Sequence, residues 1–170
     1  MSGDDKWTVC QRKALSGEYK EFLASVIVSE LMTETIHGSS ILHFAVNGGN
    51  LDILKFIIDA SPVLLFKTNY FGETPLHWAS KFGPSDVVEL LLQNGACPER
   101  PDNEGNTALH WAAEYDNIDA AKLLLSYESP VQQKNEEGQT PYDVAKIEGS
   151  TKCRKLLRCR QSLSKRFINL

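Results

Sequence analysis

Gly72-Glu-Thr-Pro-Leu-His77 recurs in this chain, because close copies of it occur at regular intervals. The other copies are Gly38-Ser-Ser-Ile-Leu-His43, Gly105-Asn-Thr-Ala-Leu-His110 and Gly138-Gln-Thr-Pro-Tyr-Asp143, and successive copies begin 34, 33 and 33 residues apart. Self-similarity at this spacing indicates one small unit stacked on itself, since a single such unit cannot bury its own apolar face.

Each copy predicts the start of a short helix. Thr74, Thr107 and Thr140 can accept a backbone N–H bond at a helix N-cap. Pro75 and Pro141 stand at the first helical position, where the missing N–H is not needed. The glycine that opens each copy suits a turn residue with a positive φ.

A second helix is expected in each unit after a short break. The break falls on Gly49, on Gly83 and on Asp116-Asn117, residue types that tolerate the left-handed conformation. The apolar runs that follow are Ile53-Leu-Lys-Phe-Ile-Ile58, Val87-Val-Glu-Leu-Leu-Leu92 and Ala120-Ala-Lys-Leu-Leu-Leu125.

Both ends of the chain carry weaker units. The fourth unit, Cys153-Arg-Lys-Leu-Leu-Arg158, replaces apolar residues by Arg154 and Arg158 on the face that a fifth unit would cover, which predicts a cap. At the other end, residues 6–15 and 17–27 have apolar residues at helical spacing and predict a degenerate helix pair.

The phrases Thr-Pro-Leu-His-Trp-Ala at 74–79 and Thr-Ala-Leu-His-Trp-Ala-Ala at 107–113 resemble the signature of the ankyrin-repeat family. The resemblance implies an all-α solenoid of stacked helix-turn-helix units joined by β-hairpin-like turns. We expect a single ankyrin-repeat domain over residues 1–170. It divides into a capping helix pair at 1–34, repeats at 35–68, 69–101 and 102–134, and a C-terminal capping repeat with a basic tail at 135–170.

Composition favours a soluble protein inside the cell. The 170 residues are 42% hydrophobic and 24% charged, which is ordinary for a globular domain. Charges interrupt the longer apolar stretches and the N-terminus lacks a signal-peptide pattern, so we expect no membrane span and a cytoplasmic or nuclear location. The four cysteines have no Cys-x-x-Cys spacing and are expected to be free thiols.

The sequence offers little for catalysis. It has no Gly-rich phosphate loop and no Gly-x-Ser-x-Gly motif, and Ser162-Leu-Ser-Lys165 matches Ser-x-x-Lys without the companion motifs. His43, His77 and His110 occupy the same slot in successive units, so stacking separates them by roughly 10 Å, too far to share one metal ion. We expect structural hydrogen bonds from these histidines, no enzyme activity, no cofactor, no metal site and no small-molecule substrate.

The resemblance implies a groove that binds another protein, lined by the hairpin tips and by the exposed side of the first helix of each repeat. Trp78 and Trp111 occupy a slot that also packs inner helices together, whereas Phe71 and Phe82 fall where a solenoid normally leaves side chains exposed. Aromatic residues with a polar rim are typical of interface hot spots. Carried onto this chain, the pattern gives twelve candidate residues: Tyr70, Phe71, Glu73, Trp78, Lys81, Phe82, Asn103, Glu104, Asn106, Trp111, Glu114 and Tyr115.

Charge divides the chain unevenly. Residues 1–149 hold all 22 acids and 11 of the 18 bases, a formal net charge of −11, whereas residues 150–170 hold seven bases and no acid, a net of +7. One interpretation is a solvated cap whose cations suit a helix C-terminus. The alternative is a site for an anionic partner, such as nucleic acid or an acidic membrane.

We therefore expect a non-catalytic module for protein–protein interaction, monomeric when free, that acts as an adaptor, an assembly chaperone or an inhibitor. Its partner is another protein, which the sequence does not identify. Two alternatives remain open: an inhibitor that occludes a host kinase or transcription factor, and binding of an anionic partner through the basic cap. Nucleic acid is disfavoured as the partner, because Phe167 is the one aromatic residue in the basic segment and no nucleic-acid motif is present.

Overall fold

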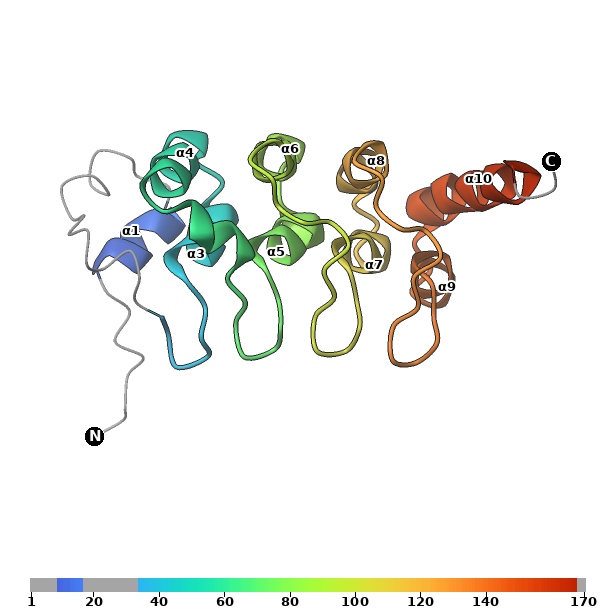
Figure 1. The fold of residues 1–170 in the computed structure, drawn as a ribbon, viewed down its shortest axis with the longest axis horizontal. Coiled ribbons are helices and arrows are strands. Elements are labelled where there is room, and N and C mark those ends of the chain that lie inside the picture. The colour runs from blue at the N-terminus through green and yellow to red at the C-terminus, as the bar shows by residue number, and fades with distance from the viewer. Residues whose placement is uncertain (1–8, 17–33, 168–170) are drawn as a thin grey trace.

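Pairs of helices stack side by side along one axis, and the loops between the pairs all project to the same side (Figure 1). This computed structural model describes residues 9–16 and 34–167. Within these ranges the regular elements are helices, and Glu34 and Ser40 form an isolated antiparallel β-bridge. The predicted all-α ankyrin solenoid is confirmed.

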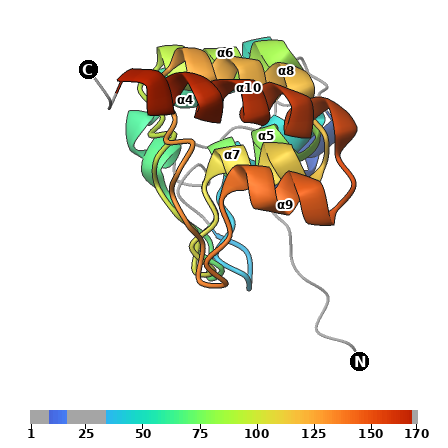
Figure 2. The ribbon, with the colours of Figure 1, turned by 90° about the vertical axis from the view of Figure 1, so that its right-hand side faces the viewer.

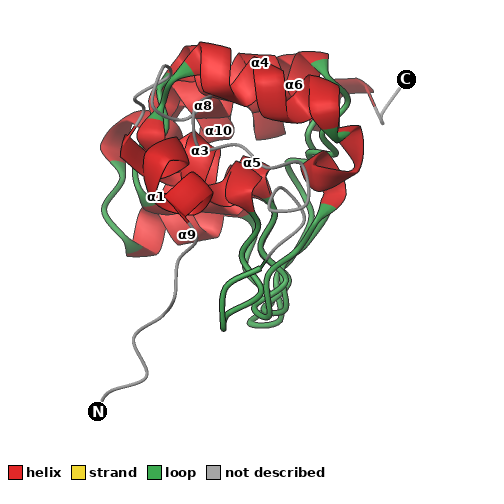
Figure 3. Cartoon of the chain, turned by 90° about the vertical axis from the view of Figure 1, so that its left-hand side faces the viewer, coloured by secondary structure: helices red, strands yellow, loops and turns green. Residues whose placement is uncertain are grey.

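The helices form two layers, which Figures 2 and 3 show end-on from opposite sides. The inner helices are α3 (Ile41–Gly48), α5 (Pro75–Phe82), α7 (Ala108–Glu114) and α9 (Pro141–Ile147). The outer helices are α4 (Leu51–Ala60), α6 (Ser85–Gln93), α8 (Ile118–Ser126) and α10 (Thr151–Phe167). The 3₁₀ helix η2 (Pro62–Phe66) follows α4, and α1 (Val9–Ser16) packs against α3.

The expected N-terminal helix pair lies only partly within the described residues. Helix α1 overlaps the first expected helix, at 6–15, and ends one residue later, whereas the second, at 17–27, lies outside the described residues. The division of the chain into repeats at residues 34, 68, 101 and 134 stays a prediction. Within the part of the chain that the structure describes, no helix is both long enough and apolar enough to span a membrane.

Short polar side chains start the helices, as predicted. The Thr74 hydroxyl accepts a bond from the His77 N–H at 3.4 Å, and the Thr140 hydroxyl accepts one from the Asp143 N–H at 3.3 Å. The outer helix α4 begins at Asn50, whose side-chain oxygen accepts from two backbone N–H groups. These bonds satisfy donors that a helix leaves free at its first turn.

The breaks between inner and outer helices do not all use the same geometry. Gly49 has φ 70° and Asp116 has φ 52°, both in the predicted left-handed region. Gly83 differs, with φ −68°. Glycine is required there for a steric reason, because a Cβ atom at this position would lie 2.5 Å from the Ala79 carbonyl oxygen.

The core is continuous from one repeat to the next. Leu76 and Leu109 occupy equivalent slots on α5 and α7, and each is at most 1% exposed. The outer helices supply a parallel row in which Leu54, Val88 and Ala121 are all fully buried. Each repeat therefore depends on its neighbours to cover its apolar side chains.

Backbone hydrogen bonds join neighbouring loops near their tips. The N–H of Tyr70 donates to the carbonyl of His37, that of Asn103 to Phe71, and that of Glu136 to Glu104, each at 2.9 Å. These equivalent bonds hold the loops in register along the stack. Each tip also carries a glycine with positive φ, as predicted.

Three buried histidines connect each inner helix to the loop of the following repeat. Nδ1 of His43, His77 and His110 accepts the backbone N–H three residues earlier, at 3.0 to 3.1 Å. Because Nδ1 accepts, Nε2 carries the proton, and it donates to a carbonyl in the next repeat. The Nε2 contacts are to Glu73 at 3.0 Å, Asn106 at 3.0 Å and Gln139 at 3.1 Å.

Burial keeps these imidazoles neutral. Loss of solvation lowers the pKa of His43 to about 4 and also lowers the pKa of His77 and of His110. Asp143 occupies the same slot in the fourth unit, where it accepts bonds from the Thr140 hydroxyl and N–H. These bonds lower the pKa of Asp143. An aspartate thus keeps the capping role but cannot donate to a further repeat.

Substitution of Leu109 tests the continuity of the core. Leu109→Ala should lower the free energy of unfolding by ~2–5 kcal/mol, because it leaves a cavity where two repeats meet. Amide exchange should also become faster in the repeats on both sides. A loss under about 0.5 kcal/mol with unaltered amide protection would contradict the packing described here.

The neutral histidines predict a loss of stability in mild acid. Between the unfolded pKa of 6.5 and the folded pKa of about 4, the unfolded His43 binds more protons than the folded one, so the free energy of unfolding falls as the pH falls. For His43 alone the loss between pH 7 and pH 5 is about 2 kcal/mol, measurable by urea unfolding.

Substitution of His43 assigns that effect. His43→Gln should flatten the dependence of stability on pH in this interval relative to the wild type, because it removes the buried imidazole whose pKa is lowered. A slope equal to that of the wild type would show that His43 is not the group that titrates.

Candidate functional site: a groove along the inner helices

A lysine surrounded by aromatic rings lies at the centre of the groove. The Nζ atom of Lys81 lies 4.6 Å from the ring centroid of Tyr115, 5.1 Å from that of Trp111 and 5.2 Å from that of Phe82. All three distances are within the range of cation–π attraction. We call these four residues the Lys81 cluster. Its members come from α5, from α7 and from the residue that ends α7, so the cluster spans two repeats.

The rings of the cluster also contact one another. Phe82 and Tyr115 meet edge to face with centroids 4.7 Å apart, a geometry that aromatic pairs favour. Nevertheless Phe82 is 70% exposed and Tyr115 is 37% exposed. The contacts therefore fix the orientation of rings that remain accessible to a partner.

Two hollows flank Trp78. The first, of about 260 Å³, is lined by Asn47, Glu73, Trp78, Lys81, Phe82 and Trp111. The second, of about 220 Å³, lies toward the first repeat and is lined by Phe71, Phe44, Trp78 and His37 among others. Because Trp78 and Glu73 border both hollows, the aromatic surface continues from Phe71 to Tyr115.

Phe71 and Tyr70 lie at the tip of the second repeat's loop. Phe71 is 57% exposed and Tyr70 is 67% exposed. The Phe71 ring lies 6.2 Å from the His37 ring of the preceding loop. The structure thus places Phe71 beside Trp78, and it places Phe82 with Tyr115, in adjoining parts of one groove.

The two tryptophans are half-buried, and their indole N–H groups bond to carboxylates. Trp78 Nε1 donates to Glu73 at 2.8 Å, and Trp111 Nε1 donates to Asp102 at 2.9 Å. The Trp78 ring also packs edge to face on His43, 5.2 Å away. These tryptophans combine internal packing with an accessible face.

Glu73 has internal partners besides its place at the rim. Its carboxylate accepts from Trp78 and, at 2.6 Å, from the side-chain amide of Asn69. In the third repeat, Asp102 occupies the position equivalent to Asn69, and its own carboxylate accepts the indole N–H bond. The carboxylate at each site orients an indole ring of the groove.

Asn103 and Asn106 tie neighbouring loops together. The Asn103 side-chain amide donates to the Tyr70 carbonyl at 2.8 Å, and the Asn106 side-chain oxygen accepts from Asn135 at 2.9 Å. Their role in holding the loops follows from these bonds.

Glu104 and Glu114 line a third hollow, of about 380 Å³, between the third and fourth repeats. Glu136, Glu137 and Glu148 also line it, so this end of the groove is strongly acidic. The three hollows and the Lys81 cluster together include ten of the twelve predicted residues, whereas Tyr70 and Asn103 lie in the loops and line none of the three hollows.

Asn69, Asp102 and Asn135 shape the groove but were not among the predicted site residues. In each loop the side-chain oxygen at this slot accepts the backbone N–H four residues later, at 2.9 to 3.0 Å. The regular spacing of these short polar residues is a signal that the sequence does contain. It escapes notice because the residues lie before the repeated phrase rather than within it.

Comparisons with known proteins agree with this architecture. The chain belongs to the ankyrin-repeat family: a family model described as "Ankyrin repeats (3 copies)" matches residues 13–102 and 96–166. Ankyrin repeats are generally non-catalytic modules for protein–protein interaction.

Individual relatives match over shorter segments. The human palmitoyltransferase ZDHHC13 is 42% identical over 66 residues, which cover 39% of this chain and 11% of that protein. The protein ACCELERATED CELL DEATH 6 of Arabidopsis thaliana is 47% identical over 55 residues, 32% of this chain and 8% of that protein. The palmitoyltransferase AKR1 of Kluyveromyces lactis is 39% identical over 64 residues, 38% of this chain and 8% of that protein. The chain thus matches only about a tenth of the length of these relatives.

Replacement of a groove tryptophan tests the indole bonds. Trp111→Phe should lower the free energy of unfolding by ~1–2 kcal/mol, because the carboxylate of the buried Asp102 loses a hydrogen bond. Tyr115→Phe, which removes an exposed hydroxyl on the same groove, should change it by less than about 0.5 kcal/mol. If both variants unfold at the same urea concentration as the wild type, the indole bond does not hold Trp111 in place.

Proposed function

We propose that this chain is a non-catalytic module that binds another protein through the groove of its inner helices. In this role it serves as an adaptor, an assembly chaperone or an inhibitor, and we propose that it acts in the cytoplasm or the nucleus. Membership of the ankyrin-repeat family supports the class of function. The exposed aromatic residues of this chain support the choice of the groove as the binding surface.

The observation that carries the proposal is the exposure of Phe82. Phe82 is 70% exposed and contacts a second exposed ring, that of Tyr115, and contiguous exposed apolar patches, unlike single exposed residues, are typical of interaction sites. Tyr115 and Lys81 hold the ring in place, so little side-chain entropy remains to be lost on binding. Rigid, accessible aromatic residues with a polar rim are the usual composition of interface hot spots.

The alternative of an inhibitor that occludes a host kinase or transcription factor uses the same groove. The alternative of a nucleic-acid partner would use the basic end of the chain instead. The salt dependence of binding distinguishes these two surfaces. Contacts with phosphate groups release counterions, so binding through them weakens steeply as salt rises. Binding through the Lys81 cluster is expected to survive moderate salt.

A partner captured from a cell lysate and then purified allows a quantitative test. Phe82→Ala should weaken partner binding by ~2 kcal/mol or more and lower the free energy of unfolding by less than about 1 kcal/mol. Phe71→Ala and Tyr115→Ala should act in the same direction, because both residues border the same groove.

Phe66→Ala is the matched control. Phe66 is 45% exposed but belongs to η2 and lines neither hollow beside Trp78, so its truncation should leave partner affinity unchanged. Equal affinities for Phe82→Ala and Phe66→Ala, once both are shown to be folded, would exclude the groove as the binding surface.

A further inference from the structure

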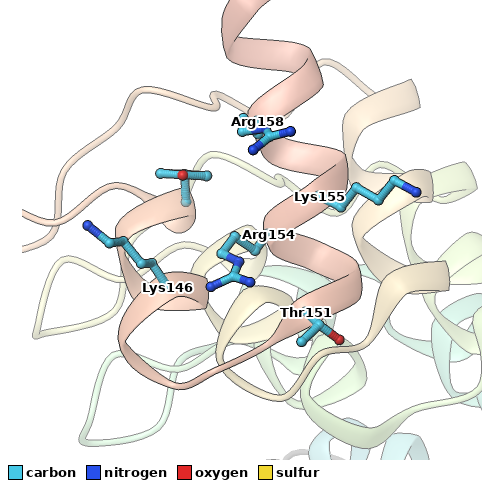
Figure 4. A pocket seen from close by; sticks show the side chains of 6 residues that line it. Lys146, Thr151, Arg154, Lys155 and Arg158 are labelled. Carbon is cyan, nitrogen blue, oxygen red and sulfur yellow. The ribbon is translucent and has the colours of Figure 1, made fainter.

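A basic pocket lies between α9 and α10, at the end of the stack opposite α1. It has a volume of about 460 Å³, within the range of sites for small ligands. The residues that line it are Tyr142, Lys146, Thr151, Arg154, Lys155 and Arg158. Figure 4 shows Lys146 on α9 beside Arg154 on α10; along α10, Thr151 lies on one side of Arg154 and Arg158 on the other, and the Lys155 side chain extends away from Lys146.

The pocket occupies the face that in each earlier repeat packs against the next one. On the outer helix, Arg154 stands in the slot of Val88 and Ala121, which are both fully buried. Arg158 stands in the slot of Leu92 and Leu125, which are 4% and 8% exposed. Two positions that are apolar at the interfaces between earlier repeats are thus occupied by cationic residues in the fourth unit.

The inner helix shows the same replacement. Lys146 stands in the slot of Ser80 and Ala113, which are both fully buried. Tyr142 stands in the slot of Leu109, and its side chain lines the pocket. The pocket is therefore the unfilled inter-repeat groove with a cationic lining.

Solubility alone does not require this lining. A solvated cap needs polar residues of either sign, and mixed charges serve best. The rest of the chain is rich in acids, yet none lines this pocket. Arg154 and Arg158 are also four residues apart on one helix, a spacing at which like charges repel. A bound anion would attract both arginines and so offset their mutual repulsion.

The cations of the pocket are available for a ligand. In the described part of the chain, no carboxylate forms an ion pair with Lys146, Arg154, Lys155 or Arg158. Asp143 lies near Lys146, but its carboxylate already accepts two hydrogen bonds from Thr140. The hydroxyls of Tyr142 and Thr151 form no hydrogen bond among the described residues.

The surroundings restrict the size of the anion. Residues 1–149 carry a net charge of −11, and the acidic hollow with Glu136, Glu137 and Glu148 lies on the neighbouring part of the fourth unit. A long polyanion such as duplex DNA would run from the pocket toward these carboxylates and be repelled. A compact anion would contact only the cations. Arginine forms paired hydrogen bonds with phosphate oxygens, and two arginines in one pocket favour a ligand with more than one phosphate group.

We propose that the pocket between α9 and α10 binds a compact anion with two or more phosphate groups, either free in solution or as the headgroup of a lipid. Arg154 and Arg158 bind the phosphates, Lys146 and Lys155 supply further positive charge, and Tyr142 and Thr151 donate hydroxyl bonds. This site is separate from the groove of the Lys81 cluster, so its function does not depend on the partner proposed above.

Calorimetric titration of the whole chain with inositol trisphosphate at physiological ionic strength tests the proposal. One molecule should bind per chain, the melting temperature should rise with ligand concentration, and inorganic phosphate should bind more weakly. The double variant Arg154→Gln, Arg158→Gln should weaken binding by about tenfold or more, because it removes charge-assisted hydrogen bonds.

The matched control is the double variant Lys122→Gln, Lys152→Gln. Both lysines are exposed and neither lines the pocket, so this variant loses the same charge and should keep most of its affinity. Phe82→Ala should bind inositol trisphosphate as the wild type does. Vesicles of phosphatidylcholine with and without phosphatidylinositol bisphosphate identify the source: retention only on the phosphoinositide vesicles indicates a lipid headgroup, and binding of the soluble ligand alone indicates a free anion.

Three results would overturn the proposal. One is no saturable binding of either the soluble ligand or the phosphoinositide vesicles. Another is an equal loss of binding in the two double variants, which would indicate attraction by net charge only. The third is tighter binding of duplex DNA than of inositol trisphosphate, which would point to an extended polyanion.

Discussion

The buried imidazole that connects one repeat to the next is the interaction on which the structure depends. Each of the three histidines accepts a bond at Nδ1 from the start of its own helix and donates one at Nε2 to the next loop. One neutral ring therefore fixes both where an inner helix begins and where the following repeat lies. A protonated ring could not accept at Nδ1, which explains why the low pKa of His43 suits its position.

The groove is a consequence of this regular stacking. Because successive inner helices lie in register, Lys81 on α5 reaches the rings of Trp111 and Tyr115, one repeat further along. Bonds between loop tips extend the same register to Phe71. The aromatic surface thus arises from side chains of the repeats themselves. At the far end, where no described repeat covers α9 and α10, the same stacking leaves a pocket that this chain lines with cations.

Most of the fold could be predicted from the sequence, because the repeated phrase encodes local events. The threonine caps, the turn glycines and the structural histidines each act within a few residues or at a fixed repeat distance. Gly83 shows the limit of prediction from residue type. The sequence predicts a left-handed conformation there, but glycine is needed because a Cβ atom would clash with the Ala79 carbonyl. The site was harder to predict in detail. The bonds of Glu73 to Asn69 and Trp78, and the position of Lys81 between three rings, depend on side-chain orientations that spacing does not specify.

Nitrogen NMR of the histidine rings reports the protonation state of each imidazole that joins two repeats. At pH 7 we expect His43, His77 and His110 all to be neutral, with the proton on Nε2 and a bare Nδ1. Long-range couplings between ring protons and nitrogens report this tautomer for each residue. A proton on Nδ1, or a doubly protonated ring, at any of the three histidines would mean that this imidazole does not join its helix to the next repeat through the bonds described above.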